Sequence, residues 1–295
     1  MNKPIAICFG EILYDVFPNQ ERIGGAPLNV ASRLSGLGIE TEMISKVGGD
    51  EKGEKLISYL KSKNIKTDNI VKDAEHATGV VNVTLSASGS ATYEIAHPAA
   101  WDKIEISEGI KNSVQNADSF IFGSLICRDE ISRKTLFELL PEAKYRIFDI
   151  NLRPPYYEKD VLVKLMEQAD FIKFNDDELF EIAEMIGSPF NSIEQNLQYL
   201  SEKTNTKTIC VTKGRHGAVL LKDGARYYNS GFKVKVKDTV GAGDSFLASL
   251  IAGLLKKEDP QGALDFACAV GALVAGEEGA NPEISKEKIQ KFMFP

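Results

Sequence analysis

The chain has 295 residues, of which 43% are hydrophobic and 26% charged, an ordinary composition for a folded globular protein. Its formal net charge of −7 and the absence of a basic block argue against nucleic acid or an anionic membrane surface as a partner. The apolar run Ile5–Phe9 is too short for a signal peptide or a membrane span, so we expect a cytoplasmic protein. The four cysteines are far apart and form no C-x-x-C pair, which predicts buried free thiols.

The first elements combine a buried strand with a glycine turn. Ile5–Leu13 is predicted to be a strand that ends around Gly10-Glu11, and Asp15 follows it, close to where open α/β sheets place groups that contact ligands. The run Gly24–Ala31 predicts a glycine turn leading into a helix with Asn29 one turn inside. Asn is unfavourable there unless its amide forms a hydrogen bond. Asp15 and Asn29 beside this turn fit recognition of a polyol, and a helix-capping turn is the alternative.

The next segments alternate and then change character. A strand over 42–47 and a helix over 51–63 continue a βαβ pattern, whereas 78–85 and 91–95 are rich in β-formers and separated by the turn-forming residues 86–90. These two runs predict a hairpin outside the parallel sheet. Together with 14–24, the segment 77–97 is expected to form a small β lid that excludes water from a substrate.

The alternation resumes after residue 118. The predicted elements are a strand over 119–124, a helix over 130–140, a strand over 146–150, a helix over 159–168, and strands over 171–174, 208–212 and 218–221. A nearly uncharged, Ala- and Gly-rich helix over 263–275 follows near the end. This pattern indicates an α/β fold with a doubly wound, mostly parallel central sheet flanked by helices, in a single domain over 1–295.

Polar groups follow several of these strands. Arg153 lies in the run Asp149-Ile-Asn-Leu-Arg-Pro-Pro, where it either pairs with a carboxylate or holds a phosphate or substrate oxygen. Asn175 and Glu178 begin a predicted helix, where acidic residues are also common without any function. Lys213–Gly217 reads as a hairpin turn between two strands.

The most informative stretch is Asp238-Thr-Val-Gly-Ala-Gly-Asp-Ser-Phe-Leu. Gly241 and Gly243 permit a tight turn, and the apolar residues after them have helical spacing. The free amides and positive dipole end of such a helix suit phosphate oxygens. A carboxylate at that position, Asp244, can take a proton from an attacking hydroxyl while the amides hold a phosphoryl group. The alternative for this residue is a simple helix cap.

These motifs, in this order, resemble the ribokinase family of carbohydrate kinases, also called PfkB. Gly24-Gly-Ala-Pro-Leu-Asn-Val-Ala31 is similar to its N-terminal signature and Asp238–Asp244 to its C-terminal signature. The run around Arg153 looks like that of fructokinases and 2-keto-3-deoxygluconate kinases. The resemblance extends over about 5–282 and implies a ribokinase-like fold.

The resemblance also implies a role for each motif. Asp244 is expected as the catalytic base, and the amides of Gly241, Ala242 and Gly243 as the anion hole. The residues implied for substrate are Asp15, Gly25, Asn29 and Arg153, and those implied for ATP are Asn175, Thr212, Gly214, Gly217 and Gly279. Glu178 is implied to hold Mg²⁺ through water, and Asp238 and Val240 to line a monovalent-cation site, expected to take K⁺. Glu283 stands where many relatives have Ser, which departs from that site.

The resulting hypothesis is an ATP-dependent sugar kinase that phosphorylates the 6-hydroxyl of D-fructose. The alternatives are a 2-keto-3-deoxygluconate kinase or another PfkB sugar or nucleoside kinase, and, from a different class, a non-catalytic sugar or nucleotide sensor. The expected partners are the sugar and ATP, with neither nucleic acid nor membrane. Family members often form a dimer contact through the lid, so a homodimer is a further expectation.

Overall fold

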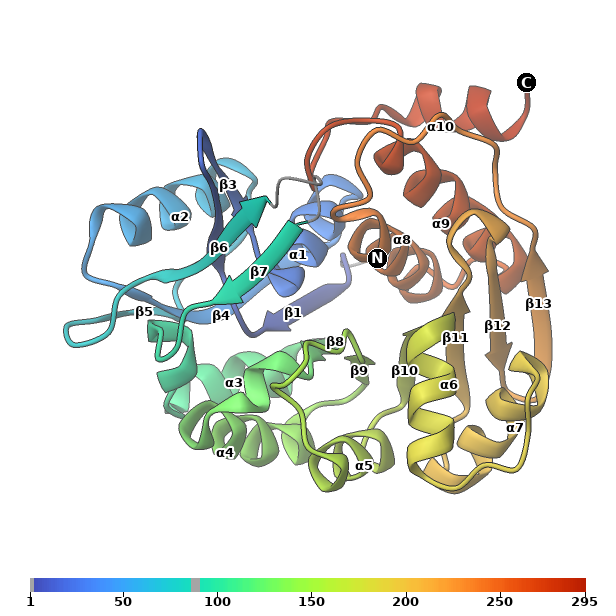
Figure 1. The fold of residues 1–295 in the computed structure, drawn as a ribbon, viewed down its shortest axis with the longest axis horizontal. Helices are drawn as coiled ribbons and strands as arrows, with labels where there is room; N and C mark the ends of the chain where they lie inside the picture. Colours follow the sequence, from blue (N-terminus) through green and yellow to red (C-terminus); the bar gives the residue numbers. More distant parts are fainter. Residues whose placement is uncertain (1–2, 86–90) are drawn as a thin grey trace.

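Two β-sheets organise the chain in the computed structural model, which describes residues 3–85 and 91–295 (Figure 1). The expected hairpin turn at 86–90 lies outside the described residues. The large sheet has nine strands in the order β13-β12-β11-β10-β9-β8-β1-β4-β5. Its strands, in chain order, are β1 (Ile5–Phe9), β4 (Glu40–Gly48), β5 (Ile70–Asp73), β8 (Ser119–Gly123), β9 (Arg146–Asp149), β10 (Phe171–Asn175), β11 (Thr208–Thr212), β12 (Ala218–Lys222) and β13 (Ala225–Asn229).

The pairing in this sheet explains where a ligand can bind. The strands from β5 to β11 are parallel, and only β12 and β13 pair antiparallel at one edge. From β1 the chain goes through β4 to β5 on one side, and later through β8 to β11 on the other. Ligands of open α/β sheets bind at the carboxyl ends of the strands where the winding reverses, which here is beside β1.

Helices cover both faces of the large sheet, as a doubly wound fold requires (Figure 1). They are α1 (Ala26–Gly36), α2 (Glu51–Ser62), α3 (Glu108–Asn116), α4 (Glu130–Leu139), α5 (Lys159–Glu167), α6 (Asp176–Met185), α7 (Ile193–Thr204), α8 (Ala242–Leu255), α9 (Pro260–Ala275) and α10 (Lys286–Met293). The buried side chains of α1, α2, α8 and the first half of α9 pack in one cluster, and those of α3 to α7 in another. The second half of α9 packs against α10. The ribokinase-like fold predicted from the sequence is therefore present.

The apolar side chains of β1 show how the two layers arise. Ile7 and Phe9 point into one cluster and Ala6 and Cys8 into the other, because successive side chains alternate across a strand. A strand covered on both faces needs apolar residues at every position, which is why this one reads as a continuous apolar run.

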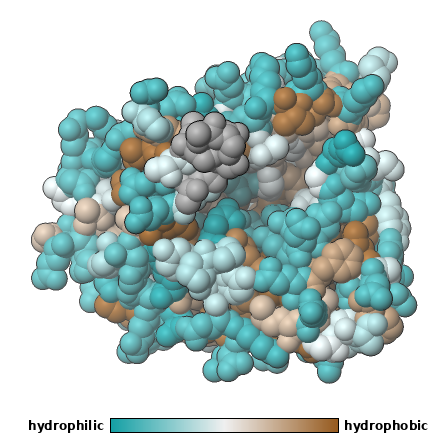
Figure 2. All heavy atoms as spheres, in the orientation of Figure 1, coloured by the Kyte–Doolittle hydropathy of each residue, from teal (hydrophilic) through white to brown (hydrophobic). Residues whose placement is uncertain are grey.

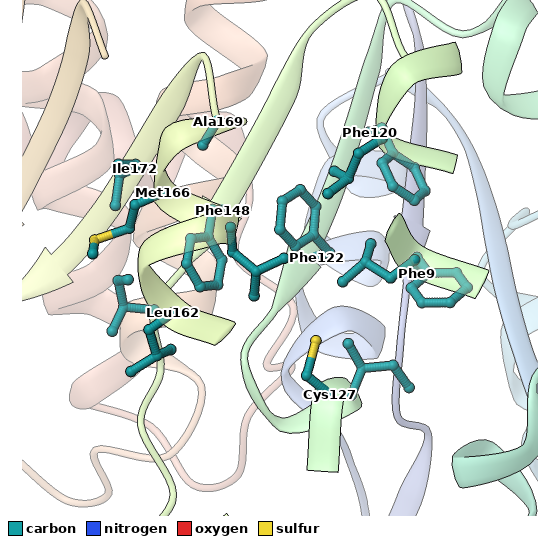
Figure 3. Close-up of a cluster of buried hydrophobic side chains, with 14 of the residues drawn as sticks. Phe9, Phe120, Phe122, Cys127, Phe148, Leu162, Met166, Ala169 and Ile172 are labelled. Atoms are coloured by element: carbon teal, nitrogen blue, oxygen red, sulfur yellow. The ribbon is translucent and has the colours of Figure 1, made fainter. Parts of the chain in front are cut away.

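Aromatic rings form a row across one face of the sheet (Figure 3). The ring centroids of Phe9 and Phe120 are 5.8 Å apart, those of Phe120 and Phe122 also 5.8 Å, and those of Phe122 and Phe148 5.2 Å. All four rings are at most 1% exposed. The row joins β1, β8 and β9 below the strand ends that carry the candidate site.

The small sheet lies beside the carboxyl ends of the large one and has the order β3-β2-β6-β7 (Figure 1). Its strands are β2 (Leu13–Phe17), β3 (Gln20–Gly24), β6 (Gly79–Leu85) and β7 (Ala91–Ile95). The segment 14–24, expected as part of the lid, is thus a hairpin of β2 and β3, and β2 pairs in parallel with β6.

The structure differs from the sequence-based expectation in several elements. The single strand expected over 5–13 is wrong, because β1 ends at Phe9 and Leu13 begins β2 in the other sheet. Gly10, with φ of 144°, allows the chain to leave the large sheet there. The elements β5, β13, α3, α7 and α10 were not expected. The four cysteines are buried and free, as expected. Within the described ranges, no helix combines the length and apolar character that crossing a membrane requires.

Candidate active site

The N-terminus of α8 forms the centre of the candidate site. Gly241 precedes the helix with φ of 75°, and a Cβ at this position would lie 2.5 Å from the Cα of Ala280, so glycine is required on both grounds. The amide of Ala242 donates to the Thr239 carbonyl at 3.2 Å, whereas within the described ranges we find no acceptor for the amides of Gly241 and Gly243. Two of the three amides expected in the anion hole are therefore free, and that of Ala242 is engaged.

Asp244 is held by a chain of side-chain amides. Its Oδ2 accepts a hydrogen bond of 2.8 Å from Asn29 Nδ2 of α1, and Asn29 Oδ1 accepts one of 2.7 Å from Asn281 Nδ2. Asn29 is 4% exposed. These hydrogen bonds explain why Asn29 occupies the first turn of α1, where Asn is otherwise unfavourable. The bond to Asp244 joins the two signature motifs, which are more than 200 residues apart in the sequence.

The environment of Asp244 suits a base that works near neutral pH. Burial raises the pKa of its carboxyl to about 6, and the negative charge of Asp149 adds to the rise. The hydrogen bond from Asn29 and the positive charges of Lys173 and Arg153 act in the opposite direction. A pKa near the working pH is favourable for general base catalysis.

A buried ion pair lies beneath the helix terminus. Lys173 Nζ of β10 is 3.0 Å from Asp149 Oδ1 at the end of β9, and both side chains are less than 10% exposed. A Cβ built on Gly243 would lie 3.7 Å from Lys173 Nζ, so this cation is directly below the free amides. Burial lowers the pKa of Lys173, but Asp149 and Glu178 outweigh it, and the net shift is upward. Lys173 is therefore charged, and it adds positive potential to the anion site.

Asn175 and Glu178 cap the helix α6 reciprocally. Asn175 Oδ1 accepts from the Glu178 amide and Glu178 Oε2 from the Asn175 amide, both at 2.8 Å. Glu178 Oε1 accepts from the Leu152 amide at 3.1 Å, and the side chain is buried. The carboxylate is thus rigid. Because both oxygens already accept backbone bonds, it suits a metal held through water better than a direct ligand.

No group of three metal-ligating side chains is found within the described ranges. Mg²⁺ in phosphoryl-transfer sites needs only one or two carboxylates besides the substrate phosphates and waters, so Glu178 fits such an ion.

A cavity of about 700 Å³ opens beside the start of α8. Its wall includes Thr212, Gly214 and Gly217 from the turn between β11 and β12, together with Ala242 and Gly243 of the helix. A Cβ at Gly217 would lie 2.0 Å from the Asn229 carbonyl oxygen, so this turn also requires glycine. The cavity is large enough for a nucleotide, and three of the five residues expected at the ATP site line it.

The remaining residues expected to bind the sugar are Asp15, Gly25 and Arg153. Asp15 is on β2, and burial raises the pKa of its carboxyl while Arg153 and Arg22 lower it. Gly25 has φ of 107°, and a Cβ there would lie 2.5 Å from the Glu11 carbonyl oxygen. Arg153 is exposed, and its Nη1 donates a hydrogen bond to the Leu152 carbonyl at 2.9 Å. Figure 2 shows this face hollowed between the small sheet and the helices, with mainly hydrophilic residues around the hollow.

The expected cation site has an unforeseen occupant. Asp238 Oδ2 is 3.0 Å from Arg22 Nη1 of β3 and accepts from the Gly279 amide at 3.1 Å, while Oδ1 accepts from the Val240 amide at 3.0 Å. Asp238, Val240 and Gly279 are brought together as expected. Both carboxylate oxygens are engaged, however, and a guanidinium at this distance repels a second cation. This arrangement does not fit K⁺ bound by the Asp238 side chain.

A family model described as pfkB family carbohydrate kinase matches residues 5–287, nearly the whole chain. The chain belongs to the PfkB family of carbohydrate kinases.

Individual relatives are consistent with this family. An uncharacterized sugar kinase from Pyrococcus horikoshii is 31% identical over 291 residues, which cover 95% of this chain and 89% of the relative. Its crystal structure in complex with ATP has a TM-score of 0.83 and covers 98% of this chain and 100% of that one. Fructokinase-2 of Zea mays is 28% identical over 309 residues, covering 95% and 91% of the two chains. The fructokinase of Vibrio cholerae, solved with fructose, ADP and calcium, shares the fold with a TM-score of 0.85 at 24% identity, covering 98% and 99% of the two chains.

Three residues of this PfkB-family site were missed in the sequence. Lys173 is a cation inside the apolar run Phe171-Ile-Lys-Phe, and a charge in a strand buried on both faces is a signal that could have revealed it. Glu11 is 3% exposed, its Oε2 has no partner within the described ranges, and burial raises its pKa to about 7. Asn281 carries no comparable signal, because only the fold brings it to Asn29.

Proposed function

We propose that this PfkB-family carbohydrate kinase transfers the γ-phosphoryl group of ATP to the 6-hydroxyl of D-fructose. The observation that carries the proposal is Asp244: a partly buried carboxylate, with its pKa raised to about 6, lies in the first turn of a helix whose start, at Ala242 and Gly243, lines a cavity of nucleotide size. The relatives described as fructokinases support the choice of sugar.

In this proposal Asp244 accepts the proton of the sugar hydroxyl as its oxygen attacks phosphorus. Asn29 orients the carboxylate through the 2.8 Å bond, and the free amides of Gly241 and Gly243, above Lys173, stabilise charge on the transferring phosphoryl group. Mg²⁺, held through water by Glu178, would offset phosphate charge when bound. Asn175 and Gly279 are proposed at the nucleotide side, together with the turn at Thr212, Gly214 and Gly217.

The sugar is proposed to lie between α1 and the small sheet. Asp15, Gly25 and Asn29 supply acceptors, a close backbone approach and an amide for neutral hydroxyls. The small sheet acts as a lid that excludes water from the phosphoryl transfer. Its role in a dimer contact remains a proposal carried over from the family.

A second substrate has one observation in its favour. The exposed guanidinium of Arg153 lowers the pKa of both Asp15 and Asp244, so its charge acts on the sugar side of the site. A sugar acid such as 2-keto-3-deoxygluconate would offer it a carboxylate.

The test is a panel of D-fructose, ribose, glucose, adenosine and 2-keto-3-deoxygluconate at equal MgATP. Fructose should have the highest kcat/KM by at least about tenfold, the effect of one or two unmatched buried hydrogen bonds. A preference for the keto-deoxy acid that disappears in Arg153→Gln would instead assign the second substrate. Absence of sugar-dependent ATP turnover with every member of the panel would favour the non-catalytic sensor.

A further inference from the structure

A second cavity, of about 360 Å³, lies between the C-terminal half of α1, the end of α2 and the segment that joins α9 to α10. None of its wall residues also lines the 700 Å³ cavity. We call it the α1–α10 cavity. The wall residues that matter here are Ser32, Arg33, Lys63, Asn281, Glu283 and Lys286.

The wall of the α1–α10 cavity has an excess of positive charge. Arg33 is partly buried and within the described ranges has no carboxylate within 4.0 Å; its bonds go to Ser245 Oγ at 3.2 Å and to the Pro282 carbonyl at 3.0 Å. Lys286 likewise has no ion pair in the described part of the chain. Lys63 Nζ is 3.4 Å from Glu283 Oε1, but the Glu283 side chain is 92% exposed. An ion pair with a carboxylate that is so exposed contributes little stabilisation, so Glu283 compensates the charge of Lys63 only weakly.

A partly buried guanidinium without an anion is unusual in a folded protein, because burial of an uncompensated charge costs free energy. Burial lowers the pKa of Arg33, which shows the same cost. Ser32 Oγ and Asn281 Oδ1 are also buried without a partner within the described ranges. The wall therefore has more charge and hydrogen-bonding capacity than the protein itself uses.

We propose that the α1–α10 cavity is a binding site for a small phosphorylated compound, distinct from the ATP and sugar sites. Arg33, Lys63 and Lys286 would surround the phosphate, with Arg33 as its buried donor. The cavity is several times larger than a phosphate group and within the range of small-molecule pockets, so the ligand carries an organic part besides its phosphate.

The site is connected to the reaction centre in two ways. Arg33 bonds Ser245, the neighbour of Asp244 in α8. Asn281 bonds Asn29, which in turn bonds Asp244. A ligand that holds the 281–286 segment would stabilise the amide chain that favours ionised Asp244. Binding there should therefore shift the acid side of the kcat profile to lower pH, and the coupling is reciprocal.

Calorimetric titration of the full chain at saturating MgADP, which fills the nucleotide site, tests the binding. The probes are glycerol 3-phosphate, inorganic phosphate and glycerol. We expect glycerol 3-phosphate to bind most tightly, inorganic phosphate more weakly, and glycerol not at all. No heat from glycerol 3-phosphate up to roughly 10 mM would overturn the proposal. Equal affinities for the two phosphates would overturn the assignment of an organic part.

Variants separate this site from the nucleotide site. Lys63→Met with Lys286→Met should weaken glycerol 3-phosphate at least about tenfold, as expected for loss of charge-assisted bonds. The matched control replaces Lys61 and Lys291 with Met, on the same two helices but away from the cavity, and should change the affinity less than about twofold. Equal affinities of the two double variants for glycerol 3-phosphate would show that the ligand binds outside the α1–α10 cavity. Loss of binding when sugar is added would show the same.

The variant Arg33→Gln removes the buried donor itself and is compared with the wild type in the same titration. If Arg33 is needed for folding, the variant with Lys63→Met and Lys286→Met still tests the site. Saturating glycerol 3-phosphate should lower the pH midpoint of the acid side of kcat in the wild type and leave it unchanged in the Lys63 and Lys286 variant. An unchanged midpoint in the wild type would refute the coupling to Asp244.

Discussion

The hydrogen bond from Asn29 to Asp244 should set the pH at which the enzyme loses activity. The bond is 2.8 Å long, Asn29 is buried and Asp244 partly buried, and the bond favours the ionised carboxylate. A hydrogen bond to a charged group contributes about 1.5 to 3 kcal/mol, which corresponds to roughly 1 to 2 pKa units. Asn29→Leu removes the donor and keeps the approximate shape of the side chain. The pKa of Asp244 should then rise from about 6 to roughly 7 to 8.

The sign of the effect follows from the base mechanism, because only ionised Asp244 accepts the proton. At pH 7 the carboxyl is roughly 90% ionised in the wild type and roughly 10 to 50% ionised in the variant. We expect kcat at saturating fructose to fall about two- to ninefold at pH 7 from this cause and to recover above pH 9.

The assay is kcat against pH from 5 to 10 at saturating MgATP and sugar. Loss of sugar contacts would lower kcat by a constant factor at every pH. Loss of the Asn29 hydrogen-bond donor would instead move the acid limb, the low-pH side of the kcat profile, to higher pH. Asn281→Leu, which removes only the support of Asn29, should move the limb in the same direction by less. An acid limb that stays in place in Asn29→Leu would show that Asp244 is not the group that titrates, and the assignment of the base would fail.

Three further outcomes follow from the same geometry. Asp244→Asn should lower kcat by a factor of roughly 10² to 10⁴, because it removes the base. It should also raise Tm by roughly 3 to 8 °C, because the raised pKa of Asp244 means that its ionisation at pH 7 costs the folded state about 3 kcal/mol. A calorimetric scan that shows a lower Tm for the variant would contradict this. Glu178→Gln should raise the Mg²⁺ concentration that gives half-maximal rate more than it changes sugar KM, and an identical Mg²⁺ curve would remove Glu178 from the metal site. While Arg22 pairs with Asp238, the rates in K⁺ and in tetramethylammonium should be equal, and Arg22→Gln should make K⁺ stimulatory; stimulation of the wild type by K⁺ would show that the pair opens.

The sequence alone determined the type of fold and the centre of the site. Short continuous apolar runs such as Ile5–Phe9 are typical of strands covered on both faces, and their alternation with amphipathic helices indicates a doubly wound sheet. The Gly241–Asp244 turn was readable because free amides at a helix start and a carboxylate beside them are local features. Such a site can be predicted because it depends only on residues that are consecutive in the sequence.

The tertiary structure decided what depends on pairing between distant segments. The segment Leu13–Phe17 belongs to the small sheet because its partner strands are β3 and β6, and its own residues do not indicate which strands it pairs with. Arg22 reaches Asp238 across more than 200 residues and changes the electrostatics of the expected cation site. The pKa of Asp244 likewise depends on burial and on Asp149 and Lys173, which different strands bring beneath the helix. Burial and long-range charge are properties of the packed molecule, so sequence patterns could place the base but not set its acidity.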